Sequence, residues 1–321
     1  MNFAVVFNLT DRTSHKIDDG GLDFSSLSPE NFAWVDLNFS EDAEIRKLLA
    51  FLGLNEQECN QMLESGNRFD FIHQQQWIAE KMQVGEIIND RLKSNALLVA
   101  MNNRLIITAH ENSSGYIKTI RQNYEQSFRS VGKTPGFIFF LLWDAIVDGF
   151  LPQIFYIDDK LEEIEDKYLE KDFSRSILDD IIRSKRMVRL LKQSLLPMQR
   201  SMRHLSGSKL EVISDAARPY LYGIFDHLDR LTESVDSLQE RVHDTFSGYN
   251  SVLSHQLNNF MKVLAIIATI MMPLSLLAAI YGTNFRYMPE LEWQYGYFVF
   301  LGVLFTLGAG MLLYFKVKKW L

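Results

Sequence analysis

The sequence predicts an N-terminal α/β domain followed by long stalk helices and two membrane-spanning helices. Three observations support this fold class. Short strand-like and helical segments alternate over residues 1–135, the pattern is helical over 136–260, and two long uncharged apolar runs lie within 261–321. The chain has 321 residues, 47% of them hydrophobic, and a net charge of -7, so a packed core is expected rather than disorder.

Composition excludes several classes of function. Cys59 is the single cysteine, which rules out an intrachain disulfide or a thiolate zinc cluster and favours a reducing compartment. A pI of about 5.6 argues against nucleic acid as a partner. Gly132-Lys133-Thr134 resembles the end of a phosphate-binding loop, but residue 127 is serine and no strand precedes it, so no nucleotide is expected. No catalytic serine, histidine and carboxylate set stands out, so neither an enzyme nor a prosthetic group is predicted.

The N-terminal domain is predicted from alternating and apolar runs bounded by turn residues. We expect strands at 3–9, 32–38, 69–73 and 77–84, and helices at 41–52 and 55–63. Asn102-Asn103 lies between two further apolar runs, 96–101 and 104–109, which predicts a β-hairpin with a tight turn.

The middle of the chain is predicted to be a helical stalk. Residues 137–170 and 174–205 favour an antiparallel helix pair. A third helix is expected to begin near Pro219, because proline fits the first turn of a helix. No convincing break follows before Tyr281, which predicts one helix on the order of 90 Å long by its rise per residue. Such a helix would couple the stalk mechanically to the membrane.

The two uncharged runs predict a membrane hairpin, with spans at about 263–283 and 295–315. The alternative, a pair of buried soluble helices, is disfavoured by the flanking lysines and aromatic residues. Lys262 precedes the first span, and Lys316, Lys318 and Lys319 follow the second, as a basic ring. The positive-inside rule then gives a multi-pass protein of the inner (plasma) membrane with both termini cytoplasmic. The sequence starts without a basic, signal-like segment.

One face of the first span is small, flexible or polar. Steps of three and four give Asn258, Met261, Ala265, Ala268, Met272, Ser275, Ala279 and Thr283. Small residues in a span mark either a close helix contact or a water-lined surface. Simple packing of the two spans therefore remains an alternative to a pore. Because two helices cannot enclose a pore, the pore hypothesis requires several copies of the chain. The second span, with small residues on one side, is expected to be the outer helix.

The residues at the end of the first span indicate a family. The run from Tyr281 to Phe285 reads Tyr-Gly-Thr-Asn-Phe and is followed by Tyr-Met-Pro-Glu-Leu at 287–291. This resembles the CorA family of two-span divalent-metal channels, whose mark at this place is Gly-Met-Asn. The segment 261–274, the Ala-Arg-Pro-Tyr at 217–220 and the terminal Lys-Lys-Trp-Leu look similar to that family as well.

The resemblance implies a funnel-shaped homo-oligomer, a pentamer, in which five first spans line the pore. Gly282, Thr283 and Asn284 would be the selectivity motif, with Asn284 as the outer ring. The pore lining would be Asn258, Met261, Leu264, Ala268, Met272, Ser275 and Ala279. Met261, Leu264 and Met272 would form apolar constrictions that gate by dewetting. The implied function is passive, potential-driven influx of Mg²⁺, with Co²⁺ or Ni²⁺ as further candidates.

Three residues bear on regulation and on the choice of ion. The resemblance implies gating by intracellular metal, and Asp226 matches a family position, whereas Gly223 stands where many members carry aspartate. Thr283 replaces the usual methionine, which leaves a ZntB-type zinc transporter as an alternative. A non-conducting, membrane-anchored coiled-coil scaffold is a second alternative. The acidic helix over 158–172 is either a solvated face or a surface that concentrates cations.

Overall fold

A computed structural model describes residues 3–8, 10–11, 13–17, 28, 30–63, 70–88, 91–110, 117–118, 120–122, 124–125, 135–170, 174–284, 288 and 293–320. Contacts divide the chain into two units. The first comprises Met1–Lys167 with Ser174–Phe246, and the second comprises Tyr168–Phe173 with Ser247–Leu321.

The first unit is built on a seven-stranded mixed sheet with the order β2-β1-β3-β7-β6-β5-β4. The strands are β1 (Phe3–Asn8), β2 (Thr13–Ile17), β3 (Asn31–Asn38), β4 (Asp70–His73), β5 (Trp77–Ile88), β6 (Arg91–Asn102) and β7 (Leu105–His110). Only the β3–β7 pair is parallel, with Ala33 opposite Leu105 and Asn38 opposite His110. All six residues of β7 are buried, as expected for a strand that is covered on both faces.

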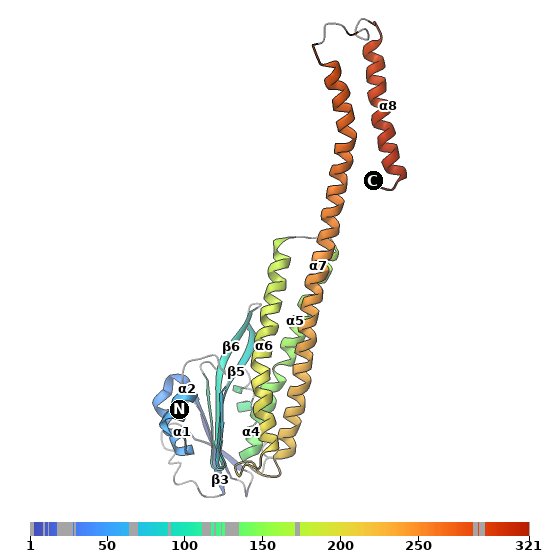
Figure 1. Ribbon diagram of the computed structural model, residues 1–321. Coiled ribbons are helices and arrows are strands. Elements are labelled where there is room, and N and C mark those ends of the chain that lie inside the picture. The colour runs from blue at the N-terminus through green and yellow to red at the C-terminus, as the bar shows by residue number, and fades with distance from the viewer. Residues whose placement is uncertain are drawn as a thin grey trace. The chain divides into compact units, whose positions relative to one another are not determined.

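Helices cover both faces of this sheet (Figure 1). On one face lie the short 3-10 helix η2 (Phe39–Glu41), α1 (Asp42–Leu52) and α2 (Glu56–Leu63), whose apolar sides join the core of buried strand residues. Gly53 ends α1 with a left-handed backbone φ of 113°. Glycine adopts this conformation readily because it has no Cβ. On the other face lie α4 (Pro135–Asp148) and α6 (Arg175–Gly207).

The predicted hairpin at Asn102-Asn103 is confirmed, since β6 and β7 pair antiparallel across it. The Asn102 side chain accepts hydrogen bonds from the backbone N–H groups of Arg104 and Leu105, at 2.8 and 2.9 Å. These two local hydrogen bonds stabilise the turn. The sequence did not predict β2, an edge strand with mostly exposed side chains, or the extension of β5 and β6 through the polar stretch between 85 and 95.

The prediction of one continuous helix over 137–170 is wrong. The structure has two helices, α4 and α5 (Leu151–Leu169), separated at Gly149 and Phe150. Pro152 stands in the first turn of α5, where proline is tolerated, but it could not have continued α4. The buried Gln153 side chain donates to the Gly149 carbonyl at 2.9 Å and to the Gly85 carbonyl at 2.7 Å, which ties the break to strand β5.

A buried polar cluster fastens α4 and α6 to the sheet. The Glu80 carboxylate of β5 accepts hydrogen bonds from the Trp143 indole N–H at 3.0 Å and from the Ser201 hydroxyl. It also lies 2.8 Å from His73 Nε2, and the other ring nitrogen of His73 lies 3.1 Å from His204 Nδ1. Since Glu80 is fully buried, these partners offset the cost of removing it from water.

The predicted long helix is confirmed as α7 (Arg218–Tyr281), 64 residues without interruption. Its first part packs in the first unit through Leu228, Leu231, Val235, Leu238 and Val242, which repeat at spacings of three and four and are buried. Its last part belongs to the second unit with α8 (Gly296–Val317). The prediction of long helices that end in an apolar pair is therefore confirmed.

Three helical segments in the described residues are long and apolar enough to cross a membrane: Pro135–Leu169, Arg218–Tyr281 and Gly296–Val317. The most apolar window of the first is 56% buried inside the protein, whereas the windows of the other two are 11% and 6% buried. The apolar surface of Pro135–Leu169 is thus covered largely by protein, because α4 packs on the sheet. The apolar surfaces of the other two remain exposed, as a membrane span requires.

Candidate functional site

The sequence motif lies directly after the last residue of α7, Tyr281. The Gly282 N–H lies 3.0 Å from the Ala278 carbonyl and 3.1 Å from the Ala279 carbonyl, so it donates to the end of the helix. A Cβ on Gly282 would lie 3.3 Å from the Ala278 oxygen, closer than most such contacts. Glycine is therefore the residue that fits the helix end without displacing these carbonyls.

The two remaining residues of the motif differ in their bonding. The backbone N–H and the hydroxyl of Thr283 both donate to the Ile280 carbonyl, at 3.2 and 2.7 Å. This hydroxyl is therefore directed back to the helix. The Asn284 side chain is exposed. Its carboxamide offers an oxygen acceptor and two N–H donors beyond the end of the span.

The two helices of the second unit meet along one side of α7. Their contacts are Tyr281 with Phe300, at 4.6 Å between ring centroids, Leu274 with Gly308, and the Lys262 ammonium 5.9 Å from the centre of the Trp320 ring. A Cβ on the glycine would lie 3.5 Å from the leucine, so this small residue permits the close approach. The contacts join the helices near both ends and in the middle.

All seven residues of the predicted pore lining are exposed. At about 100° per residue, Met261, Ala268 and Ala279 lie on the side of α7 opposite Lys262, Ile266 and Tyr281. Met272 is 72% exposed, the largest fraction for any methionine in α7. The small and polar face thus runs along α7 to the motif without being used for packing against α8.

The basic residues at the end of α8 are exposed and follow an ordered helix terminus. Lys316 is in the last turn, Lys318 is the C-cap, and Lys319 has a left-handed φ of 56°. The Trp320 N–H donates to the Phe315 carbonyl at 3.0 Å, which turns the chain back toward the helix. Cations at this end also interact favourably with the helix dipole.

The predicted regulatory residue Asp226 lies on the exposed part of α7 in the first unit. It pairs with Arg230, one turn further along the same helix. A Cβ on Gly223, one turn before Asp226, would meet no atom within 4 Å, so the position has room for a side chain. Both side chains of the ion pair are more than half exposed, so the pair contributes little to stability.

Acidic residues of α4 lie near this part of α7. His227 Nδ1 is 3.6 Å from the Asp148 carboxylate. Partial burial raises the pKa of Asp144 above its ordinary value, and the negative charge of Asp148 raises it further, whereas His227 lowers it. Among the residues that the structure describes, no group of three or more His, Cys, Asp or Glu side chains could hold a metal ion.

These features define a class of protein: an α-helical membrane protein with a large α/β domain, a span that continues a stalk helix, and an exposed polar motif between two spans. Comparison with known proteins gives the family. The model of the CorA-like Mg²⁺ transporter protein family matches residues 29–319. The chain therefore belongs to this family, and it is a divalent cation transporter rather than an enzyme.

Individual relatives agree with this assignment. The chain is 27% identical over 292 residues to the cobalt/magnesium transport protein CorA of Thermotoga maritima. The aligned region covers 90% of this chain and 83% of the relative. Its fold resembles the CorA magnesium transporter of Methanocaldococcus jannaschii, with a TM-score of 0.84 and 17% identity over 100% and 99% of the chains. It also resembles the ZntB cytoplasmic domain of Vibrio parahaemolyticus, with a TM-score of 0.63 and 14% identity over 79% and 100%.

Proposed function

We propose that the protein is a passive channel through which Mg²⁺ enters the cell, with Co²⁺ and Ni²⁺ as further permeant ions. It acts as a homo-oligomer, a pentamer, of identical subunits in the inner membrane, with both termini in the cytoplasm. Residues 1–135 are its cytoplasmic α/β domain, 136–260 its stalk and 261–321 its membrane hairpin with the basic tail.

The observation that carries this proposal is the exposed face of α7 that ends at the motif. A helix that faces only hydrocarbon does not need a row of small, flexible or polar side chains, whereas such residues can line a water-filled path that apolar constrictions close. Two helices cannot enclose such a path, so copies of α7 have to surround it, with α8 outside. Asn258 would then line the cytoplasmic end, and Met261, Leu264 and Met272 would form the apolar constrictions.

The chemistry of Asn284 fits a hydrated magnesium ion. Mg²⁺ loses its water shell reluctantly and prefers oxygen ligands. A ring of neutral carboxamide oxygens can accept hydrogen bonds from the water shell without stripping it. A carboxylate ring would hold the ion more firmly and slow its release. The exposure of Asn284 and the diversion of the Thr283 hydroxyl to Ile280 both favour Asn284 as the group that meets the ion.

Transport needs no ATP in this proposal. Moving a divalent ion inward across about 100 mV releases roughly 4.6 kcal/mol, since each charge contributes roughly 2.3 kcal/mol. The protein therefore needs a closed state when internal metal is plentiful. Intracellular metal bound near Asp226 is the proposed signal for closure, and the basic ring of Lys316, Lys318 and Lys319 would repel cations at the inner mouth when the path is shut.

A zinc transporter of the ZntB type is the second candidate. Two observations favour it, namely Thr283 in place of methionine and the fold shared with the Vibrio parahaemolyticus ZntB domain. The two candidates differ in the ion and in its driving force. A non-conducting scaffold is a weaker alternative, because the family consists of transporters.

Ion flux into proteoliposomes tests the proposal. The purified full-length protein should carry Mg²⁺ inward when an inside-negative potential is applied, with Co²⁺ or Ni²⁺ entering more slowly or as competitors. Zn²⁺ flux driven by a proton gradient, without Mg²⁺ flux, would favour the second candidate. An assembly that carries none of these ions under either gradient would refute both.

A further inference from the structure

We infer that the outward face of α5 in one subunit docks into the groove between α6 and α7 of the next subunit, in a head-to-tail contact. The inference rests on the homo-oligomer of the proposed function and adds which surfaces join its subunits. It comes from two complementary surfaces that a single chain leaves unpartnered in its first unit.

The first surface is a row along α5. Phe155, Asp159, Glu162 and Asp166 follow one another at spacings of four and three, so they share one face of the helix. All four are exposed, and Phe155 at the apolar end of the row is 58% exposed. Other carboxylates of α5 point elsewhere and are paired, whereas no cation in the described part of the chain pairs with the three acidic residues of this row.

The paired carboxylates show that α5 has two distinct acidic sides. Asp158 bonds to Arg241 of α7 at 2.5 Å, and Glu165 bonds to the Thr245 hydroxyl at 2.6 Å and lies 3.6 Å from the same arginine. These contacts hold α5 against α7 within one chain. The outward row is therefore not needed for internal packing, and its charges are available to a partner.

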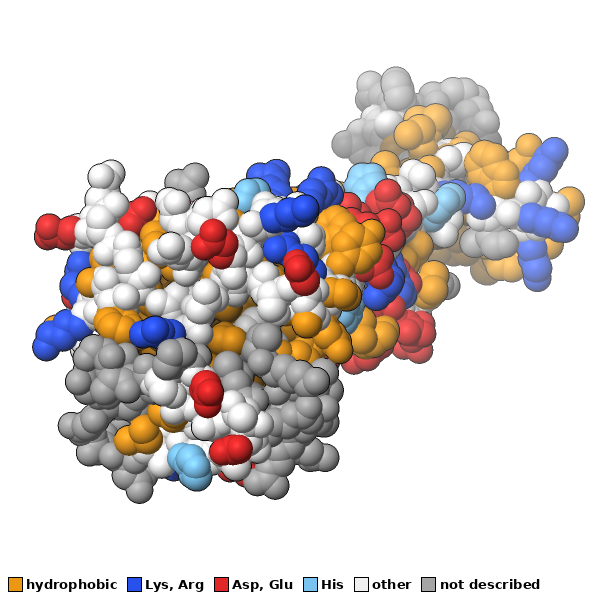
Figure 2. Space-filling model, turned by 90° about the horizontal axis from the view of Figure 1, so that it is seen from below, with side chains coloured by type: hydrophobic (Ala, Val, Ile, Leu, Met, Phe, Trp, Pro, Cys, Tyr) orange, Lys and Arg blue, Asp and Glu red, His pale blue; other side chains and the backbone are white. Residues whose placement is uncertain are grey.

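The second surface is a groove of about 980 Å³ between α6 and α7. Its floor is apolar, with Ile182 and Phe246 still 48% and 41% exposed. Lys185, Arg186 and Arg189 line it on α6, and within the described ranges no carboxylate pairs with any of them. Figure 2 shows basic and acidic side chains gathered in separate patches on one face of the molecule. An apolar floor with a basic rim fits a helix whose exposed face combines aromatic and acidic residues.

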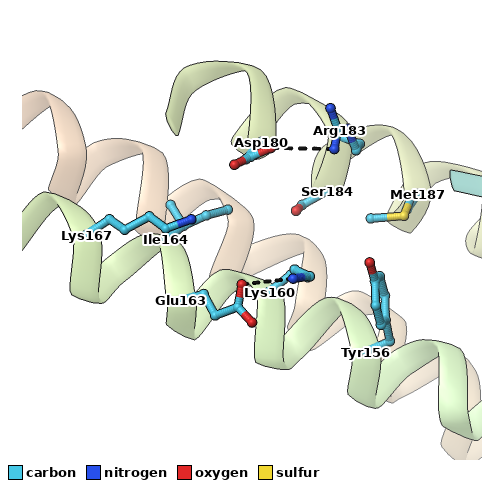
Figure 3. Close-up of a pocket in the computed structure, with 9 residues that line it drawn as sticks. All are labelled: Tyr156, Lys160, Glu163, Ile164, Lys167, Asp180, Arg183, Ser184 and Met187. Carbon is cyan, nitrogen blue, oxygen red and sulfur yellow. Dashed lines mark hydrogen bonds and ion pairs between the residues drawn. The ribbon is translucent and has the colours of Figure 1, made fainter. Parts of the chain in front are cut away.

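The two surfaces also lie at the same level along the helix pair. A pocket of about 230 Å³ between α5 and α6 brings Tyr156 and Lys160 together with Ser184 and Met187 (Figure 3). Asp159 and Glu162 flank Lys160 in sequence, and Lys185 and Arg186 lie between Ser184 and Met187. The acidic centre of one surface is thus level with the basic rim of the other.

This shared level matters because identical subunits of a ring are related by rotation. A rotation about an axis that runs along the helix pair preserves level, so each surface then meets a partner surface at the same height. Two different surfaces at one level give a heterologous contact, which closes into a ring when the rotation fits.

Cysteine cross-linking in membranes tests the contact in the full-length protein. In a Cys59→Ala background, Glu162→Cys combined with Arg186→Cys should give a ladder of oxidised products that extends beyond the dimer. The matched control combines Glu162→Cys with Arg203→Cys, an exposed residue about 26 Å further along α6, and should give at least tenfold less product above the monomer.

Charge reversal supplies a second readout. Asp159→Lys with Glu162→Lys, or Lys185→Glu with Arg186→Glu, should each reduce the assembled fraction in native mass spectrometry at least tenfold. A chain that carries all four substitutions should restore it, because the reversed row of each subunit then faces the reversed groove of the next. Restoration also shows that the substitutions leave the fold intact.

The failures of the two ideas are distinguishable. A wild-type protein that assembles and conducts Mg²⁺, while neither the ladder nor the charge reversals behave as stated, overturns this contact and leaves the proposed channel intact. A wild-type protein that stays monomeric and conducts nothing overturns both. Assembly that is lost on either reversal but not restored in the chain that carries all four substitutions refutes direct pairing of these surfaces.

Discussion

The ring of Tyr281, the last residue of α7, packs against the ring of Phe300 in α8, with the two centroids 4.6 Å apart and the planes inclined by 44°. The contact lies one residue before the motif and joins the two apolar helices at that end. Because the hydrogen bonds described for Gly282 and Thr283 run to carbonyls of their own helix, the position of Gly282 depends on where this contact fixes the end of α7.

Tyr281→Ala should weaken metal flux by loosening the motif, although it leaves the motif itself unchanged. An aromatic pair of this kind is worth about 0.5–1.5 kcal/mol beyond its buried area. We expect lower flux and a lower thermal unfolding temperature in detergent, with Tyr281→Phe close to wild type because it retains the ring. Equal flux in Tyr281→Ala and wild type would show that the contact does not position the motif.

Asn284→Ala should abolish Mg²⁺ flux into proteoliposomes while the protein still assembles, because it removes the proposed amide ring. Gln294→Ala is the matched control, since it removes an exposed amide from the same linker region outside the motif. The control should conduct as wild type does. If both variants keep full flux, the ion is recognised elsewhere in the protein.

Asp144→Asn should stabilise the protein at neutral pH. Its pKa is raised in the folded state by burial and by Asp148, so the folded protein keeps a proton that the unfolded chain has already lost. The free energy of unfolding therefore falls as pH rises from near 3.8, the ordinary carboxyl pKa, through the raised pKa of the folded state. At higher pH this loss of stability stays constant.

Unfolding measured as a function of pH checks this sign. The advantage of Asp144→Asn over wild type should vanish in acid, below the ordinary carboxyl pKa, and be largest at neutral pH. Asp148→Asn removes the second cause of the shift and should narrow the pH range over which wild type loses stability. A constant difference at every pH would indicate a packing effect instead.

Two glycines of α7 should respond differently to an added methyl group. Gly223→Ala adds a Cβ in open space within a helix, which should raise the free energy of unfolding by about 0.5–1 kcal/mol. Gly248→Ala places a Cβ 2.7 Å from the Tyr168 hydroxyl, so that side chain has to shift. We expect the second variant to be less stable than the first in thermal unfolding, and the reverse order would contradict the packing described for this helix.

Glu80→Leu should destabilise the first unit strongly. It leaves the Trp143 indole, the Ser201 hydroxyl and His73 buried beside an apolar side chain, and each unsatisfied group costs about 1–3 kcal/mol. Glu80→Gln preserves shape and an acceptor oxygen, so its loss should be clearly smaller. Similar losses in the two variants would mean that the hydrogen bonds of Glu80 are not the source of the effect.

Local chemistry explains which parts of the fold could be predicted. The Asn102 turn, the buried strand 31–38 and the helix from Arg218 to Tyr281 follow from short-range signals: a turn-forming side chain, an apolar run and an uninterrupted helical pattern. The break at Gly149 was missed, because apolar and helix-forming residues continue through it. Its position depends on Gln153 reaching the Gly85 carbonyl, a contact between residues far apart in sequence.

The candidate site divides in the same way. The sequence alone predicted the two spans, the motif at Gly282–Asn284 and the small and polar face of the first span, because length, hydropathy and helical period are properties of one segment. Only the tertiary structure decided which side of α7 meets α8, that Asp226 pairs with Arg230, and which charges of α5 and α6 remain unpaired. Those outcomes depend on which surfaces are brought together in space, and a one-dimensional pattern carries the periodicity of a helix face but not the identity of its neighbour.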